Sequence, residues 1–234
     1  MEPFGLALKD YWKGNISAKV MFYRDDGLID EYFVKHCFRE PDEFSELEKK
    51  ALNLCSGKVL DVGAGVGPHS LFLQAMGFDV YSLDISAEAC DIMKRRGLKN
   101  VSCSDIYDLQ KGNFDTILLL GRAIGLAGDL EGMVEFLEHC KNLLSSKGKI
   151  ILDSLDVRVT TKPDHLAYQE RNKKIGRYIG VVGLKMEYNG HYGQEFKLLH
   201  IDPDTLKTIA VELSWKVKIL HQEENGDFLA KISK

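Results

Sequence analysis

The sequence predicts an α/β protein built on a doubly wound, mostly parallel sheet of seven strands. From residue 58 onward, short apolar runs alternate with segments of helical periodicity, which is the pattern of parallel strands joined by helices. The run Thr116-Ile-Leu-Leu-Leu120 is apolar without alternation, as expected for a strand that is covered on both faces. A glycine-rich turn directly after the first strand also fits this fold class.

The expected parallel strands are 58–62, 79–83, 100–103, 114–120 and 149–152, with helices at 67–76, 86–96 and 129–145. A last helix at 203–213 has Asp202 as a candidate N-cap and Pro203 in its first turn. Strands at 215–221 and 227–232 then form a C-terminal antiparallel hairpin.

The segments outside this core are expected to cover it. Residues 1–56 are expected to form a helical cap, and Pro41 is a candidate for the start of one of its helices. The polar stretch 154–175 contains Pro163 and is expected to be a long loop, and 178–188 with 194–201 predict an inserted hairpin. The expected organisation is one domain over 1–234, with a cap at 1–56, a core at 58–155 and 203–232, and an insertion at 156–201 over the active site.

Composition restricts the possible partners. The formal net charge of −4 gives no overall basic field for nucleic acid, and no apolar run approaches the roughly 20 residues that span a bilayer. The five cysteines form no CxxC pair and the histidines show no metal-ligand spacing, so we expect no metal and a reduced, cytoplasmic protein. The N-terminus lacks the pattern of a signal peptide, and the sequence leaves monomer and dimer open.

The stretch Val59-Leu-Asp-Val-Gly-Ala-Gly-Val-Gly67 indicates a ligand-binding loop. Glycines at alternate positions after a strand tolerate positive φ and let a ligand approach the main chain, next to a helix N-terminus. The dinucleotide fingerprint G-x-G-x-x-G would need glycine at position 68, which is Pro68. A purely structural strand-to-helix turn is the other alternative.

The string Asp61-x-Gly63-x-Gly65-x-Gly67 resembles the first motif of class I S-adenosylmethionine-dependent methyltransferases, which have a Rossmann-like fold. The resemblance implies that Gly63, Ala64, Gly65 and Gly67 back the methionine part of the cofactor. It also implies that Asp61 helps to hold the amino group of the cofactor, directly or through water.

Later segments extend this resemblance over residues 58–155. Asp84 ends the second strand, where an acid can accept both ribose hydroxyls, although dinucleotide enzymes use the same device. Capping of the next helix is the alternative role for Asp84, and it can coexist with ribose binding. Ile85 is expected to pack on the adenine. Asp105 and Ile106 match the acid and apolar neighbour that the family places at the adenine, with a solvated loop acid as the alternative for Asp105.

The fourth and fifth strands complete the pattern. Leu120 and Gly121 end the fourth strand, which lies beside the cofactor in the family. Residues 143–148 resemble the family turn into the fifth strand, with Ser146 and Lys147 in place of the usual Pro-Gly. The resemblance therefore implies an enzyme with S-adenosylmethionine as cofactor and S-adenosylhomocysteine as product.

The methyl acceptor is less defined. The strand-four end lacks the Asn/Asp-Pro-Pro-Tyr/Phe string of enzymes that methylate planar amino groups in nucleic acid bases or glutamine, so a small molecule is favoured over a protein side chain. Arg122 suits an acceptor carboxylate or phosphate, or forms a surface ion pair. His69 is either helix packing or a cleft residue. Tyr11 and Tyr23 are further candidates for the acceptor site, because they could form a cap over it together with Trp12 and Phe22. The alternative is that these four residues form a satellite core under an N-terminal helix.

The candidate lid residues over the site share the predicted hairpin: Tyr178, Tyr188, His191, Tyr192 and His200. Two other function classes stay open. One is a cofactor-binding protein of the same fold without catalysis, and the other is an NAD-type oxidoreductase, which Pro68 disfavours.

Overall fold

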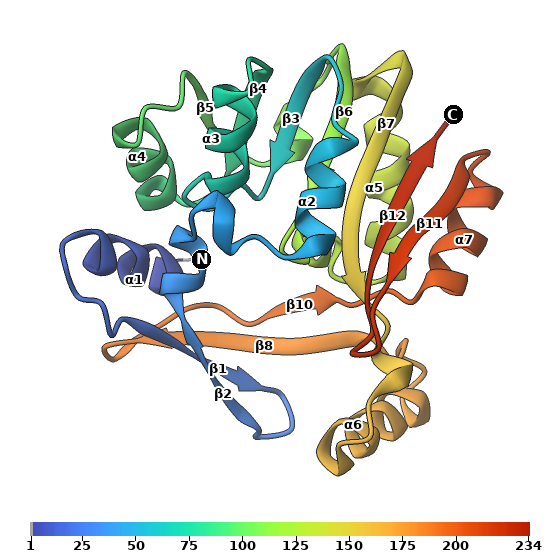
Figure 1. The fold of residues 1–234 in the computed structure, drawn as a ribbon. Helices are drawn as coiled ribbons and strands as arrows, with labels where there is room; N and C mark the ends of the chain where they lie inside the picture. Colours follow the sequence, from blue (N-terminus) through green and yellow to red (C-terminus); the bar gives the residue numbers. More distant parts are fainter. Residues whose placement is uncertain (1) are drawn as a thin grey trace.

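Five parallel strands form the centre of the larger sheet in the computed structural model, which describes residues 2–234 (Figure 1). They are β3 (Lys58–Val62), β4 (Asp79–Asp84), β5 (Asn100–Cys103), β6 (Phe114–Leu119) and β7 (Leu144–Leu155). The sheet order is β11-β12-β7-β6-β3-β4-β5, in which β11 (Lys216–Gln222) and β12 (Asp227–Ser233) are antiparallel. The predicted fold class is confirmed.

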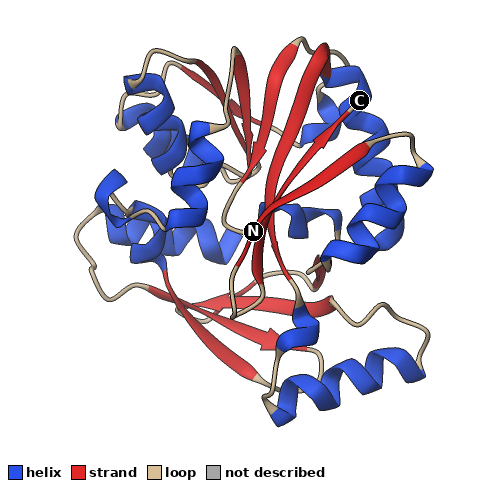
Figure 2. Ribbon diagram, turned by 45° about the vertical axis from the view of Figure 1, so that its right-hand side comes forward, coloured by secondary structure: helices blue, strands red, loops and turns tan. Residues whose placement is uncertain are grey.

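Helices cover both faces of this sheet (Figure 2). The helices of the core are α2 (Glu46–Asn53), α3 (Pro68–Ala75), α4 (Ala87–Arg95), α5 (Leu130–Leu143) and α7 (Pro203–Glu212). The α2 side packs on strand residues such as Leu118 and Leu229, while α5 and α7 pack on the opposite face, where Phe136 is fully buried. Burial of such a side chain contributes roughly 1.5–3 kcal/mol, so the two layers hold the strand ends in fixed positions.

Local capping explains where two helices begin. The Asp202 side chain accepts the N–H groups of Asp204 and Thr205, which confirms its predicted role as N-cap of α7. The α2 helix does not begin at Pro41, which starts the short 3-10 helix η2 (Pro41–Glu43). It begins after Ser45, because a capping box forms there. The Ser45 hydroxyl accepts the Glu48 backbone N–H, and the Glu48 carboxylate accepts the Ser45 backbone N–H.

The N-terminal segment is only partly helical, so the prediction of a helical cap over 1–56 was wrong in part. After α1 (Glu2–Trp12), the chain forms β1 (Lys19–Arg24) and β2 (Ile29–Phe33), followed by the 3-10 helix η1 (Val34–Phe38). Gly27 has a φ of +94° in the turn between the two strands, a conformation that favours a tight hairpin.

This N-terminal hairpin joins the inserted hairpin in a second, antiparallel sheet. Its order is β10-β8-β1-β2, and the short β9 (His191–Tyr192) also pairs with β8 (Val181–Tyr188). The strand β10 (Phe196–Leu199) packs against the 3-10 helix η4 (Ala123–Ala127), which follows β6. Figure 1 shows the second sheet across the end of the larger sheet toward which the β3 arrow points. The carboxyl ends of the parallel strands therefore face this second sheet.

The expected loop at 154–175 was also wrong, since it contains η5 (Val157–Val159) and α6 (Pro163–Lys174). Pro163 occupies the first turn of α6, where its missing N–H costs nothing, and basic residues fill the last turn. The helix is polar because it buries little: Tyr168, Gln169 and Asn172 are its buried residues. The expected turn at 143–148 is instead the beginning of β7, which starts at Leu144.

Asp25 links α6 to the second sheet. Its carboxylate accepts the Tyr168 hydroxyl at 2.6 Å, Arg177 at 3.0 Å and Arg171 at 3.1 Å. The Tyr168 hydroxyl also accepts the backbone N–H of Gly183 in β8 at 3.0 Å. These donors hold the pKa of Asp25 below its usual value, although burial acts in the opposite direction.

We expect Asp25→Ala to lower the free energy of unfolding by about 1–2 kcal/mol, because it leaves three donors without their acceptor. Urea denaturation followed by circular dichroism measures this change. Asp30→Ala, at an exposed position on β2, is the control and should stay within about 0.5 kcal/mol of the wild type. Equal effects of the two substitutions would contradict the role of Asp25.

Candidate active site

The glycine loop adopts the backbone that the sequence requires. Gly63, Gly65 and Gly67 have φ values of +68°, +58° and +79°, a region that other residues rarely adopt. A Cβ atom on Gly65 would meet nothing within 4 Å, so the backbone is open at this point. A Cβ atom on Gly67 would lie 2.5 Å from Leu98 Cδ1, so this glycine serves close packing at the start of α3.

The Asp84 carboxylate fixes this loop to the end of β4. Its Oδ2 accepts the Gly65 N–H and its Oδ1 accepts the Ser86 N–H, both at 2.8 Å. Burial raises the pKa of Asp84, and the two backbone N–H groups partly oppose that shift. The N-cap of α4 is Ser86, which accepts the Ala89 N–H, so Asp84 is not the capping residue.

Asp61 lies beneath the loop and is 2% exposed. The Ser70 hydroxyl donates to its Oδ2 at 2.7 Å, and Ser82 in turn donates to Ser70 at 2.8 Å. Burial raises the pKa of Asp61. This chain of hydroxyl groups connects the end of β3 to α3 and to β4, and thereby supports the loop from below.

The residues predicted at the adenine follow β4 and β5. Asp105 caps the 3-10 helix η3 (Ile106–Asp108) by accepting the Tyr107 N–H at 3.1 Å. Ile106 is 3% exposed and belongs to the main core, whereas Ile85 is 56% exposed. Of the two isoleucines, Ile85 is the one with apolar surface left to offer a ligand.

The end of β6 contains two consecutive residues in the left-handed region. Gly121 has a φ of +69° and Arg122 a φ of +61°, which is costly for a residue with a side chain. The Arg122 N–H donates to Asp153 Oδ1 at 2.8 Å, which stabilises this turn. Leu120, just before it, is 5% exposed.

The guanidinium of Arg122 is already paired. Its Nε and Nη2 donate to Asp227 Oδ1 at 3.0 and 2.6 Å. This is the ion pair that the sequence left open as an alternative to acceptor binding. The Arg122 side chain remains 41% exposed, so the pair borders solvent.

His69 is packed inside the protein. Its Nε2 lies 2.8 Å from Glu48 Oε1, and both residues are buried. Arg39 donates two further hydrogen bonds to Glu48, and these partners lower the pKa of Glu48 to about 2 despite its burial. The network joins α2 and α3 and agrees with the packing interpretation of His69.

The structure does not bring Tyr11 and Tyr23 together. Tyr11 stacks on Phe38 with ring centroids 4.5 Å apart, within the cluster formed by α1 and the N-terminal strands. Tyr23 instead lies beside Tyr192 at 6.1 Å. Adjacent strand residues point to opposite faces, so Tyr23 is on the other side of β1 from Phe22, which belongs to that cluster.

Two of the candidate lid tyrosines have structural roles. The Tyr178 hydroxyl donates to Asp202 at 2.6 Å, and the Tyr188 hydroxyl donates to Asp10 at 2.9 Å. The ring of His200 is different, because its Nδ1 is buried and has no hydrogen-bond partner among residues 2–234. His191, like Tyr192, is exposed at the turn of the hairpin.

The sequence reasoning missed Asp153 and the pair formed by Tyr32 and Cys37. The Tyr32 hydroxyl lies 3.7 Å from Cys37 Sγ. The pKa of Cys37 is raised to about 11, chiefly by burial, and the Asp84 carboxylate contributes to this shift. Cys37 also packs in the cluster that contains Val66 of the glycine loop, so the N-terminal segment contacts this loop. Asp153 follows an apolar run directly, as Asp84 does, and this pattern was the sequence signal that could have identified it. No sequence pattern pointed to Cys37.

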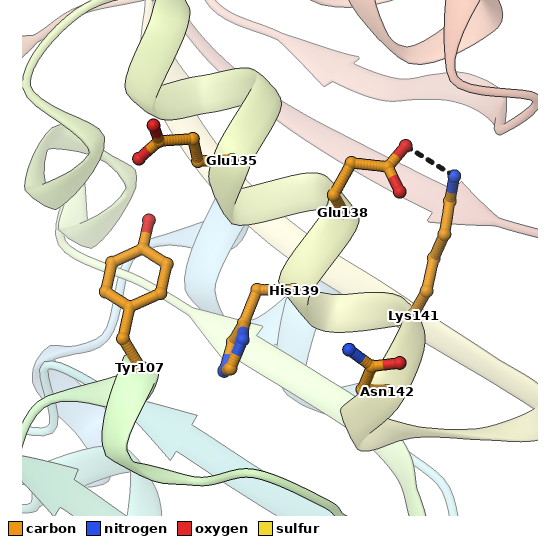
Figure 3. Close-up of a pocket in the computed structure, with 6 residues that line it drawn as sticks. All are labelled: Tyr107, Glu135, Glu138, His139, Lys141 and Asn142. Atoms are coloured by element: carbon orange, nitrogen blue, oxygen red, sulfur yellow. Dashed lines mark hydrogen bonds and ion pairs between the residues drawn. The ribbon is translucent and has the colours of Figure 1, made fainter.

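A pocket of about 500 Å³ lies elsewhere, on the outer side of α5 (Figure 3). Its lining residues are Tyr107, Glu135, Glu138, His139, Lys141 and Asn142. His139 Nε2 lies 2.9 Å from the Ile106 carbonyl oxygen, so α5 supports η3 from behind. Lys141 pairs with Glu138 at 2.6 Å, and none of the predicted site residues lines this pocket.

Comparison with known proteins identifies the family. A family model described as a methyltransferase domain matches residues 59–148. A crystal structure of an S-adenosylmethionine-dependent methyltransferase from Bacteroides fragilis, in complex with S-adenosylhomocysteine, is 32% identical. The alignment covers 98% of this chain and 93% of that chain, with a TM-score of 0.86. The chain belongs to the S-adenosylmethionine-dependent methyltransferases.

More distant structures share the fold of this methyltransferase. The DhpI complex with S-adenosylhomocysteine is 18% identical, with a TM-score of 0.58, and the alignment covers 99% of this chain and 97% of that chain. The CcbJ methyltransferase from Streptomyces caelestis is 12% identical, with a TM-score of 0.60 and coverage of 82% and 93%. A search of curated proteins finds no match.

The residues of the methyltransferase fit its cofactor, S-adenosylmethionine. The left-handed glycines leave open backbone at Gly65 and Gly121, where a Cβ atom would meet nothing within 4 Å. Asp84, whose two oxygens each hold one N–H group, retains lone pairs for further donors. No group of acids, histidines and cysteines suited to a metal, and no helix long and apolar enough to cross a membrane, occurs within residues 2–234.

The methyltransferase also contains a carboxylate that is unfavourable for stability. Asp153 in β7 is 8% exposed, and burial raises its pKa to about 6. The folded state therefore keeps the Asp153 proton to higher pH than the unfolded state, whose Asp pKa is about 3.9. The stability from this proton is present below about pH 4 and is lost as pH rises through 6.

We expect Asp153→Asn to increase the free energy of unfolding at pH 8 by up to about 3 kcal/mol, and to lose this advantage at pH 4. The asparagine carbonyl oxygen can still accept the Arg122 N–H. Urea denaturation at both pH values measures the difference. A variant that is destabilised to the same extent at pH 4 and pH 8 would contradict the raised pKa.

Proposed function

We propose that this methyltransferase transfers the methyl group of S-adenosylmethionine to a small-molecule acceptor. The observation that carries the proposal is the second sheet, which packs by way of β10 on η4 beside the carboxyl ends of the parallel strands. A Cβ atom on Gly125 in η4 would lie 2.8 Å from Leu198 Cγ in β10, which shows how closely the two approach. An acceptor bound beneath such a cover is limited in size.

Charge supports the same choice. The net charge is −4, and acids lie near the carboxyl ends of β3, β4 and β7 and at the start of β12, which runs antiparallel to β7. Nucleic acid recognition depends on basic surfaces that neutralise phosphates, so this edge of the sheet suits neither DNA nor RNA. The five unpaired cysteines support a reducing compartment such as the cytoplasm.

We assign the cofactor contacts along the edge of the sheet. The loop from Gly63 to Gly67, supported by Asp61, holds the methionine part, and Asp84 accepts the ribose hydroxyls. Asp105 and Ile85 hold the adenine, and Leu120 and Gly121 border the reacting end. When bound, S-adenosylmethionine supplies an activated methyl group on its sulfonium, so the protein has to supply position and exclusion of water.

Calorimetric titration with S-adenosylhomocysteine tests the cofactor assignment. We expect Asp84→Ala to weaken binding by about 30-fold or more, because hydrogen bonds to a charged group are worth roughly 1.5–3 kcal/mol each. Asp79→Ala, at the other end of β4, is the control and should bind like the wild type. Wild-type affinity in Asp84→Ala, or binding of NAD in place of S-adenosylhomocysteine, would contradict the assignment.

Turnover distinguishes an enzyme from a cofactor-binding protein without catalysis. The wild type is incubated with S-adenosylmethionine and panels of small amines, acids and phenols, and S-adenosylhomocysteine formation is measured. We expect at least one panel to accelerate its formation, whereas a binding protein would show the calorimetric signal alone.

A further inference from the structure

One buried carboxylate at the edge of the sheet has no cation bonded to it. Asp153 Oδ1 accepts the Arg122 backbone N–H at 2.8 Å. Its other oxygen, Oδ2, accepts no hydrogen bond from residues 2–234. This oxygen is also not among the buried side-chain atoms that lack a partner in residues 2–234, so it keeps some exposed surface and offers free lone pairs to a ligand.

The neighbouring charges do not neutralise Asp153. The guanidinium of Arg122 bonds Asp227 at the start of β12, and His69 on α3 bonds Glu48 of α2. His200, after β10, stays neutral at physiological pH because burial lowers its pKa to about 4, with a further contribution from Arg122. The three charged or titratable groups that act on Asp153 are Arg122, Asp227 and His69, and each of them already has another partner.

The position of β7 in the sheet places Asp153 on one side of the cofactor site. The strand order runs β5-β4-β3-β6-β7, so Asp105, Asp84 and the glycine loop follow one another along the edge. The proposed adenine, ribose and methionine contacts follow the same direction. Asp153 of β7 comes next in this order, beyond the Leu120–Gly121 turn, and accepts the Arg122 N–H from that turn. Because Leu120 and Gly121 are assigned to the reacting end of the cofactor, an acceptor next to the methyl group would lie toward Asp153.

We propose that Asp153 binds the protonated amine of the acceptor and takes its proton, which makes this enzyme an N-methyltransferase of small amines. The inference rests on the proposed function and deepens it by naming the acceptor class. The neutral ring of His200 is close to the same charged neighbours as Asp153, namely Arg122 and Asp227, and its Nδ1 is buried without a partner in residues 2–234.

The proton and electron balance is simple. The ammonium passes one proton to the Asp153 carboxylate, which leaves a lone pair on nitrogen. That lone pair forms the new N–C bond while the C–S bond breaks and its electron pair stays on sulfur. The methylated product leaves as an ammonium ion, and Asp153 returns its proton to water. Since the pKa of Asp153 is about 6, the carboxylate is charged and able to act as a base at neutral pH.

The test compares two ligands that differ at the reacting centre. Sinefungin carries an amine where S-adenosylmethionine carries its methyl group, and S-adenosylhomocysteine carries nothing there. The ratio of their dissociation constants therefore reports the charge on the acceptor side, because contributions from the adenosine contacts cancel. Calorimetry gives this ratio at pH 5 and pH 8 for the wild type, Asp153→Asn and the control Asp79→Asn.

We expect the wild type and Asp79→Asn to prefer sinefungin at pH 8 by about tenfold or more, a difference of about 1.4 kcal/mol, and to lose most of the preference at pH 5. Asp153→Asn should show little preference at either pH while its affinity for S-adenosylhomocysteine stays within about threefold of the wild type.

A preference that survives in Asp153→Asn would overturn the inference. Loss of S-adenosylhomocysteine binding in Asp153→Asn would also overturn it, because the residue would then serve the cofactor site. Failure of the wild type to bind S-adenosylhomocysteine would instead overturn the proposed function.

Discussion

The carboxylate of Asp84 accepts the N–H groups of Gly65 and Ser86, and the geometry of the edge proposed to hold the cofactor depends on this double hydrogen bond. It joins the end of β4, the glycine loop and the start of α4 in one unit. The loop needs such a constraint because alternating glycines lose much conformational entropy on folding. Burial makes the charged carboxylate costly, and the two N–H groups offset part of that cost.

The second sheet combines two segments that lie far apart in the sequence. β1 pairs with β2 on one side and with β8 on the other, so the N-terminal hairpin and the insertion form a single cover. The cover and the cofactor loop also share a core, because Val66 packs with Val20 and Met186. The proposed acceptor side is therefore shaped by residues that neither segment positions alone, apart from the loop that is assigned to the cofactor.

Much of the core could be predicted because its signals are local. The apolar runs, the Asp202 cap and the glycine loop each depend on a few neighbouring residues. The N-terminal hairpin was missed although Asp26-Gly27 is a turn signal, because β1 gains its second partner from β8, about 160 residues away. α6 was missed because a polar helix has no apolar periodicity, and the pairing of Arg122 with Asp227 joins two segments about 100 residues apart.

The central claim is that the ends of β3, β4, β5 and β6 hold the cofactor. Hydrogen–deuterium exchange with and without S-adenosylhomocysteine tests this claim most directly. The account predicts slower exchange on binding in segments 63–67, 84–87, 105–108 and 120–123, with little change at the exposed turn 189–193. Protection confined to α5 and the pocket beside Tyr107, with none in the glycine loop, would contradict it.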